Sequence, residues 1–193
     1  MSQKVKTILG IVVFALLIMG AVLAYNTLSK QSKPENNTVT SDDNDKNSDA
    51  DNAKQKASDF AMTNKDGNTV MLSDLLSNGK PIVLNFWASW CPPCKSEMPE
   101  FEAVYKELGD EVQFMMVDLV DGQRETAELG AMHIARHGFT FPVYFDTEQE
   151  AAYAYGIRSI PTTLFIDTEG YIVTGRVGAL DEEMLREHIE MIR

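Results

Sequence analysis

The longest apolar stretch of the chain lies near its N-terminal end. Thr7–Ser29 contains no charged residue, and its central part, Ile8–Tyr25, is almost wholly apolar. This length suits a helix that spans a membrane. Lys4 and Lys6 precede the stretch, and the positive-inside rule keeps such lysines in the cytoplasm. We therefore predict that residues 1–28 form a cytoplasmic N-terminus and a single transmembrane anchor, with everything after it on the extracytoplasmic face of the cell membrane.

A cleaved signal peptide is the alternative to an anchor. Val22 and Ala24 resemble the small residues that precede a cleavage site, and cleavage there would give a secreted protein. The apolar run is long for a signal peptide, which favours the uncleaved anchor.

The pattern changes after the apolar stretch. Residues 29–59 are rich in Asn, Asp, Ser and Lys, and they offer little more than Val39 and a few alanines for burial. Such a segment cannot form a core, so we predict a disordered polar tether. Its function would be reach, because it lets a domain work at some distance from the membrane.

From Phe60 onward, apolar residues recur with the periods of strands and helices, which predicts one folded domain over residues 60–193. The pattern predicts a hairpin around 64–68, strands at 82–87, 112–119, 141–145, the second half of 157–167 and 171–177, and helices after 94, over 125–136, over 148–155 and after Asp181. Strands that alternate with helices indicate an α/β domain.

The only two cysteines of the chain lie at one of these junctions between a strand and a helix. Cys91 and Cys94 follow the predicted strand 82–87, and Pro92 between them suits the first position of a helix. Cys91 then lies at the helix N-terminus, where unpaired N–H groups and the helix dipole stabilise a thiolate. A thiolate is the species that attacks disulfides, so this placement predicts a redox-active dithiol.

Two structural interpretations of the cysteine pair are weaker. A disulfide that closes so small a loop removes little entropy from the unfolded chain. A structural zinc site needs about four ligands, and there is no second cysteine pair.

Composition narrows the class of partner. Apolar residues make up 44% of the chain, which is enough for a core. The net charge is −12, and the segment before Phe60 is balanced, so the domain carries the whole of this charge. An acidic domain without a basic stripe argues against nucleic acid as a partner.

The folded part resembles the thioredoxin superfamily. The stretch 86–95, Phe-Trp-Ala-Ser-Trp-Cys-Pro-Pro-Cys-Lys, resembles the redox loop of that family, Pro99 matches its proline in the active-site helix, and 157–162, Ile-Arg-Ser-Ile-Pro-Thr, resembles its cis-proline loop. The resemblance implies a thioredoxin-like fold with a central mixed sheet flanked by helices.

Within that superfamily the chain resembles the TlpA/ResA-type reductases of bacterial membranes. The predicted anchor, the hairpin before the core and the extra helix over 125–136 point to this group. Thioredoxins have a buried aspartate six residues before the first cysteine, and here that residue is Asn85. The ResA-type proteins have an active-site glutamate three residues after the second cysteine, and here that residue is Glu97. Cys91, Cys94 and Glu97 are spaced three apart, so they share one helix face.

The resemblance assigns roles to the residues around the dithiol. It implies that Cys91 attacks, that Cys94 resolves the mixed disulfide, and that Glu97 manages a proton. Substrate contacts are expected from Trp90, from Pro92 and Pro93 between the cysteines, and from Ile160 and Pro161, whose cis bond would bring the Ile160 backbone beside Cys91.

The histidines offer one further pattern. His133 and His137 are four residues apart on a predicted helix, which is the spacing of a metal-binding pair. No acid or cysteine completes a site, and both fall off the apolar face that Ala127, Ala131 and Ile134 form. We therefore predict that they lie on a solvated face, and we assign no metal.

The function expected from the sequence is thiol–disulfide exchange in the reducing direction, without a cofactor. The resemblance implies a protein disulfide as substrate, either apocytochrome c or an oxidised methionine sulfoxide reductase, and a CcdA-like membrane protein as electron donor. The alternatives are a disulfide-donating oxidase, a peroxiredoxin-type thiol peroxidase and a Sco-like metallochaperone. The inserted helix is small for the first, the peroxidase motif Pro-x-x-x-Thr-x-x is absent before Cys91, and the cysteine spacing does not fit the third.

Overall fold

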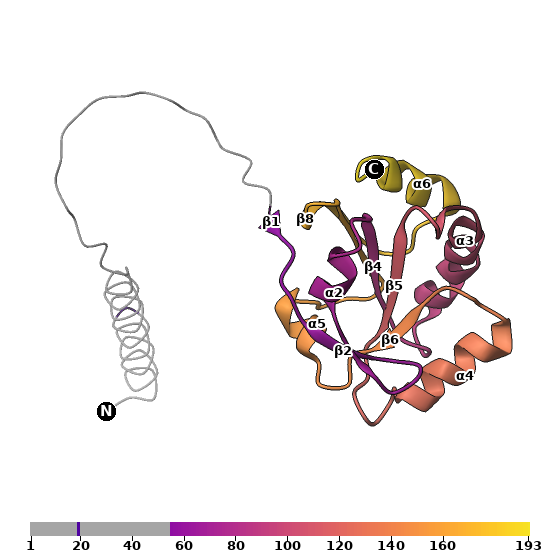
Figure 1. Cartoon of the computed structure of the whole chain (residues 1–193). Coiled ribbons are helices and arrows are strands. Elements are labelled where there is room, and N and C mark those ends of the chain that lie inside the picture. Colours follow the sequence, from indigo (N-terminus) through magenta and orange to yellow (C-terminus); the bar gives the residue numbers. More distant parts are fainter. Residues whose placement is uncertain (1–18, 20–54) are drawn as a thin grey trace, which may run out of the picture. The chain divides into compact units, whose positions relative to one another are not determined.

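A computed structural model describes Met19 and residues 55–193, and Figure 1 draws the other residues as a thin grey trace. Apart from Met19, the predicted anchor lies outside the described residues, and so does most of the predicted tether. Within the part that is described, no helix has the length and apolar character needed to span a membrane.

Eight strands form one sheet with the order β1-β8-β7-β4-β5-β6-β2-β3. The bounds are Gln55–Lys56 (β1), Ala61–Asn64 (β2), Thr69–Met71 (β3), Ile82–Trp87 (β4), Gln113–Asp118 (β5), Val143–Phe145 (β6), Thr162–Ile166 (β7) and Tyr171–Val177 (β8). The central strand β4 pairs in parallel with β5 and antiparallel with β7. The sheet is therefore mixed, as the resemblance implied.

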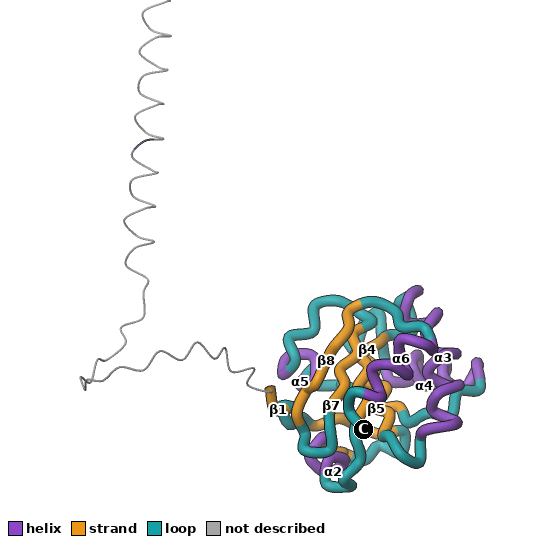
Figure 2. Tube along the Cα trace, turned by 90° about the horizontal axis from the view of Figure 1, so that it is seen from above, coloured by secondary structure: helices purple, strands orange, loops and turns teal. Residues whose placement is uncertain are grey.

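Helices cover both faces of the sheet (Figures 1 and 2). Their bounds are Leu72–Leu76 (α2), Pro92–Leu108 (α3), Ala127–His137 (α4), Glu150–Ala154 (α5) and Glu182–Glu190 (α6). Every residue of β4 is buried, because helices pack on both of its sides. Alternate β4 residues enter two cores, one with α3 and α6 around Trp87 and one with α2 and α5 around Phe86.

The N-terminal hairpin is present and extends the sheet. The strands β2 and β3 form the predicted hairpin, and β2 pairs antiparallel with β6, so the hairpin adds two strands beyond β6. Phe60 and Met62 at this end of the domain are buried in the core around Phe86.

The domain begins before Phe60, so the predicted tether boundary at residue 59 was wrong. Lys56 pairs with Tyr171 at the edge of the sheet, and the Ala57 N–H donates to the Gly170 carbonyl at 2.8 Å. Backbone groups can pair with a sheet edge whatever their side chains are, and a pattern of apolar residues does not show such pairing.

The inserted helix α4 begins two residues later than predicted and turns another face to the sheet. Thr126 caps it, so Glu125 lies in the preceding loop. Ala131 is exposed, while Gly130 is buried because this glycine allows close approach to the sheet. His133 therefore faces inward and contacts Trp87, with 6.0 Å between the ring centroids, so its predicted solvated position was wrong.

Candidate active site

The active site forms where β4 ends and α3 begins. Cys91 is the N-cap residue of α3, and Pro92 and Pro93 occupy the exposed first two positions of the helix. Cys91 and Cys94 are joined in a disulfide, and the Cys94 N–H donates to the Cys91 Sγ atom at 3.2 Å. In the reduced protein this N–H faces the sulfur that would carry the negative charge, which favours a thiolate at Cys91.

A second loop, which precedes β7, lies beside Cys91. The Ile160–Pro161 peptide bond is cis, as the resemblance implied. The carbonyl oxygen of Ile160 lies 3.7 Å from the Cys91 Sγ atom. Cys91 is 2% exposed and Cys94 is fully buried, so a partner reaches the first sulfur before the second.

Glu97 lies one turn after Cys94 on α3, and it is only 1% exposed. Its Oε1 atom accepts a hydrogen bond from the Asn85 amide at 2.9 Å, and its Oε2 atom accepts one from the Leu180 N–H at 3.0 Å. The Asn85 amide also donates to the Thr163 hydroxyl at 2.9 Å. Burial raises the pKa of Glu97 from 4.5 to about 7, although both hydrogen bonds oppose the rise.

Trp90 forms part of the surface beside the disulfide. It is 39% exposed, and the Arg124 guanidinium lies over its ring, 3.2 Å from the centroid. Trp90, Arg158 and Ile160 line a cavity of about 270 Å³ together with residues of the loop after β5. An extended segment of a partner could occupy this cavity and reach the Ile160 backbone beside Cys91.

Three residues near the site were not found by sequence reasoning. Arg124 covers Trp90, and Glu125 accepts hydrogen bonds from the Ser89 N–H at 3.0 Å and the Ser89 hydroxyl at 2.8 Å. Asp118, at the end of β5, is fully buried. For Asp118 the sequence offered one signal of burial, because this acid ends a strand whose middle is apolar. For Arg124 and Glu125 it offered none.

The two histidines of α4 do not form part of a larger ligand set. The His133 and His137 rings lie 4.3 Å apart by their centroids. Burial lowers the pKa of His133, and the charge of His137 acts in the same direction. Across the described residues, no three His, Cys, Asp or Glu side chains gather in a way that could hold a metal ion.

The site defines a class of protein, the thioredoxin-like thiol–disulfide oxidoreductases. Its dithiol lies at a helix N-terminus, with a backbone carbonyl beside the first sulfur and a buried carboxyl group one turn beyond the second.

Comparisons with known proteins agree with this class. The model of the AhpC/TSA family matches residues 53–174. The thiol-disulfide oxidoreductase ResA of Halalkalibacterium halodurans is 34% identical over 142 residues, which cover 73% of this chain and 77% of that protein. ResA of Bacillus subtilis is 33% identical over 138 residues, which cover 71% and 74%. The chain therefore belongs to the thioredoxin-like AhpC/TSA family, within its ResA-type thiol–disulfide oxidoreductases.

A solved structure supports the same assignment. StoA from Bacillus subtilis is 30% identical, with a TM-score of 0.59, and the match covers 68% of this chain and 96% of that one. The chain matches the AhpC/TSA family but lacks the peroxidase motif before Cys91. Leu84 and Ala88 occupy the positions where the motif before a peroxidatic cysteine has Pro and Thr.

Proposed function

We propose that this protein reduces protein disulfides on the outer face of a bacterial membrane. The Cys91 thiolate attacks one sulfur of a substrate disulfide, and the other substrate sulfur leaves as a thiolate that takes up a proton. Cys94 then loses its proton and attacks Cys91, which releases the second substrate thiol. Two electrons pass to the substrate, and the protein is left with the Cys91–Cys94 disulfide that the structure contains.

The buried carboxyl group of Glu97 is the observation that supports the reducing direction. A negative charge one turn from Cys94 disfavours a second negative charge on either sulfur and so raises the thiol pKa values. A strong oxidant needs the opposite, because its reduced form is stabilised as a thiolate. With a pKa of about 7, Glu97 also exchanges protons near neutral pH, so it can accept the proton that Cys94 gives up.

The proposal places the domain outside the cell on an N-terminal anchor. The support is the charge-free stretch from Thr7 to Ser29 behind Lys4 and Lys6. A protein in this position must be reduced again after each turnover. A membrane protein of the CcdA type, which carries electrons across the membrane, is the donor that we propose.

Two substrate classes suit this position. One is apocytochrome c, which holds a Cys-x-x-Cys-His site, and the other is an oxidised methionine sulfoxide reductase. Both present a disulfide to the Trp90 side of the cavity described above, and the substrate backbone would pair with Ile160.

The experiment is to trap partners in cells with the full-length chain. Cys94→Ser should accumulate mixed disulfides at Cys91, because no second thiol resolves them, and Cys91→Ser should accumulate none. Identification of the trapped proteins then names the substrate and the donor. If Cys91→Ser forms mixed disulfides and Cys94→Ser does not, Cys94 is the attacking cysteine and Cys91 the resolving one.

Location is tested separately. Protease added to spheroplasts should digest the domain and leave a membrane-bound N-terminal fragment. A soluble full-length chain, or a mature chain that begins near Tyr25, would refute the anchor.

A further inference from the structure

Buried polar atoms without a partner gather at one place beside the active site. Within the part of the chain that the structure describes, six buried side-chain polar atoms have no hydrogen-bond partner. Five of the six belong to Trp87, Asp118, Glu125 and His133, where β4, β5 and α4 meet. Buried polar groups are normally paired, so this concentration calls for a chemical explanation.

Asp118 is the most enclosed member of this group. It ends β5 directly opposite Trp87 of β4, and it is fully buried. Neither of its carboxyl oxygens has a hydrogen-bond partner among the described residues. A Cβ atom on Gly130 would overlap the Asp118 Oδ2 atom, so the backbone of α4 lies directly over the carboxyl group.

Glu125 connects this group to the redox loop. It is also fully buried, and its Oε2 atom accepts both hydrogen bonds that Ser89 donates. Ser89 precedes Cys91 by two residues. The loop that carries Glu125 is held in shape by the Asp121 carboxylate, which accepts from the Glu125 N–H at 2.9 Å and from two neighbouring N–H groups.

Two neighbouring buried carboxyl groups cannot both be ionised at low cost. Glu125 has donors in Ser89 and in the Trp90 backbone that stabilise its charge, whereas Asp118 has none among the described residues. The charge therefore lies on Glu125 and the proton on Asp118. Burial, followed by the charge of Glu125, raises the pKa of Asp118 to about 9. Burial also raises the pKa of Glu125, and its bonds from Ser89 oppose that rise.

Among the described residues, no cationic side chain pairs with the Asp118 carboxyl group. From β4 it lies beside Trp87, and from α4 it lies against Gly130. The titratable group of α4 that contacts Trp87 is His133, whose pKa is lowered by burial. After β6, Asp146 directs its carboxylate to the N–H groups of Ala151 and Ala152. On the loop before α4, Asp121 adds a negative charge near Glu125, and Arg124 places its guanidinium over Trp90.

We propose that Asp118 and Glu125 are positioning residues that hold a single negative charge beside the redox loop, with ionised Glu125 holding Ser89 and neutral Asp118 allowing that charge to stay buried. Loss of the Asp118 proton would put a second negative charge near that of Glu125. Glu125 would then move away from Asp118 and release Ser89, and the redox loop would lose its support. Thiol–disulfide exchange would therefore fall at alkaline pH for a reason separate from thiol ionisation.

The test uses the full-length chain with its disulfide intact, so that no thiol titrates. Trp87 and Trp90 are its only two tryptophans, and they lie on either side of Ser89, so their fluorescence reports on this loop. Wild-type protein should show a fluorescence transition with a midpoint near pH 9. Asp118→Asn, which keeps the shape and cannot ionise, should lose the transition. Asp110→Asn, at an exposed position, is the matched control and should keep it.

A second variant covers the case in which Asp118→Asn does not fold. Glu125→Gln removes the neighbouring charge, so the transition should move to lower pH while burial keeps it above the ordinary range of an aspartate. A midpoint equal to that of the wild type would show that the charge of Glu125 does not act on Asp118, and would overturn the proposal.

Activity gives the third readout. At pH 7, Asp118→Asn and the wild type should exchange thiols and disulfides at about the same rate. At pH values above 9, the variant should be the faster of the two, so the ratio of its rate to the wild-type rate should increase. The proposal is overturned if the wild type has no transition between pH 7 and 10, if Asp118→Asn keeps it, or if the rate ratio does not change with pH.

Discussion

The amide of Asn85 donates hydrogen bonds both to Glu97 and to Thr163, each at 2.9 Å. An asparagine amide is not acidic, so it cannot take part in proton transfer at this position of β4. It instead fixes the orientation of Glu97, the acid nearest to Cys94 along α3. The acid of the dithiol site, Glu97, thus lies on α3 rather than on β4. Asn85, at a buried position of β4, orients it.

The raised pKa of Glu97 predicts how stability changes with pH. Between pH 4.5 and about 7 the folded protein holds a proton that the unfolded chain has lost, so this contribution to stability is complete below 4.5 and is lost as the pH rises to about 7. The loss is on the order of 3 kcal/mol. Glu97→Gln cannot ionise, so its stability relative to the wild type should improve by up to this amount between pH 4 and 8.

Urea unfolding of the oxidised proteins at several pH values measures this difference. Asp118 titrates in both proteins, so its effect cancels when the two are compared. Parallel curves of unfolding free energy against pH would show that Glu97 is already ionised when folded.

Glu97→Gln should also lower the thiol pKa of Cys91. Removal of a nearby negative charge favours the thiolate, so the alkylation curve should move to lower pH. Turnover with a protein disulfide should nevertheless slow, because the proton acceptor for Cys94 is lost. Alkylation rates against pH give the thiol pKa, and Glu100→Gln, one turn further along α3, is the control. Equal alkylation curves and equal turnover would exclude a role for Glu97.

Gly130→Ala tests the contact between α4 and β5. Alanine is the better helix former by about 1 kcal/mol, so propensity alone predicts a gain in stability. The added Cβ would instead overlap the Asp118 carboxyl group, and such overpacking costs about 1–3 kcal/mol. We therefore expect a net loss of stability. In an Asp118→Ala background the space is free, and the same substitution should be neutral or stabilising.

The four proteins of this double-mutant cycle are compared by urea unfolding. If Gly130→Ala has the same effect in both backgrounds, the carboxyl group of Asp118 does not lie against α4.

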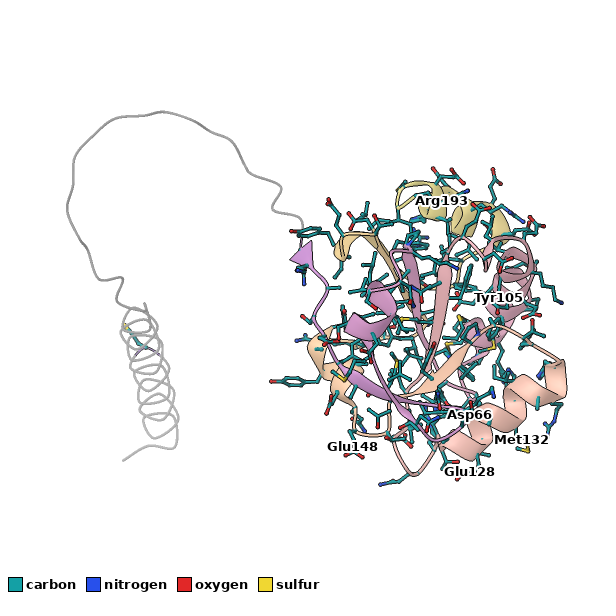
Figure 3. The ribbon with its side chains drawn as sticks, in the orientation of Figure 1. Asp66, Tyr105, Glu128, Met132, Glu148 and Arg193 are labelled. Carbon is teal, nitrogen blue, oxygen red and sulfur yellow. A yellow bond between two sulfur atoms is a disulfide. The ribbon has the colours of Figure 1, made fainter. Side chains whose placement is uncertain are left out.

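Arg124→Gln removes the guanidinium from the Trp90 ring. An exposed cation–π contact contributes about 0.5–1 kcal/mol, so KM for a protein disulfide should rise by about two- to fivefold while kcat stays the same. Arg124→Lys should recover part of the loss. Arg136→Gln is the control for the loss of one positive charge, because Arg136 is exposed on α4. Figure 3 labels Met132 on the same helix. An unchanged KM in Arg124→Gln would show that Trp90 binds partners without this contact.

Local patterns were enough to predict the centre of the site. The spacing of Cys91, Cys94 and Glu97 places them on one face of any helix that begins at Pro92, and the strand before them is apolar throughout. Burial of the side chain at this face, and with it the raised pKa of Glu97, followed from the packing of α3 against the sheet.

Contacts between segments far apart in the sequence could not be predicted in this way. The bonds of Glu125 to Ser89 and the position of Arg124 over Trp90 depend on the path of the loop after β5. Glu125 was predicted to start a helix, where an acid is normally solvated, and a helical period does not show where a preceding loop turns inward.

The sequence by itself determined the class of fold, the dithiol and its placement at a helix N-terminus, because these depend on residue types and spacings within short segments. Tertiary structure alone decided which face of α4 packs inward, where the domain begins, and that Asp118 and Glu125 are buried, with Glu125 accepting hydrogen bonds from Ser89. The inward face of α4 is set by Gly130, which allows the helix to approach the sheet closely. The start of the domain is set by backbone pairing at the sheet edge. Burial of the two carboxyl groups matters chemically, because the pKa of a carboxyl group depends on what surrounds it once the chain has folded.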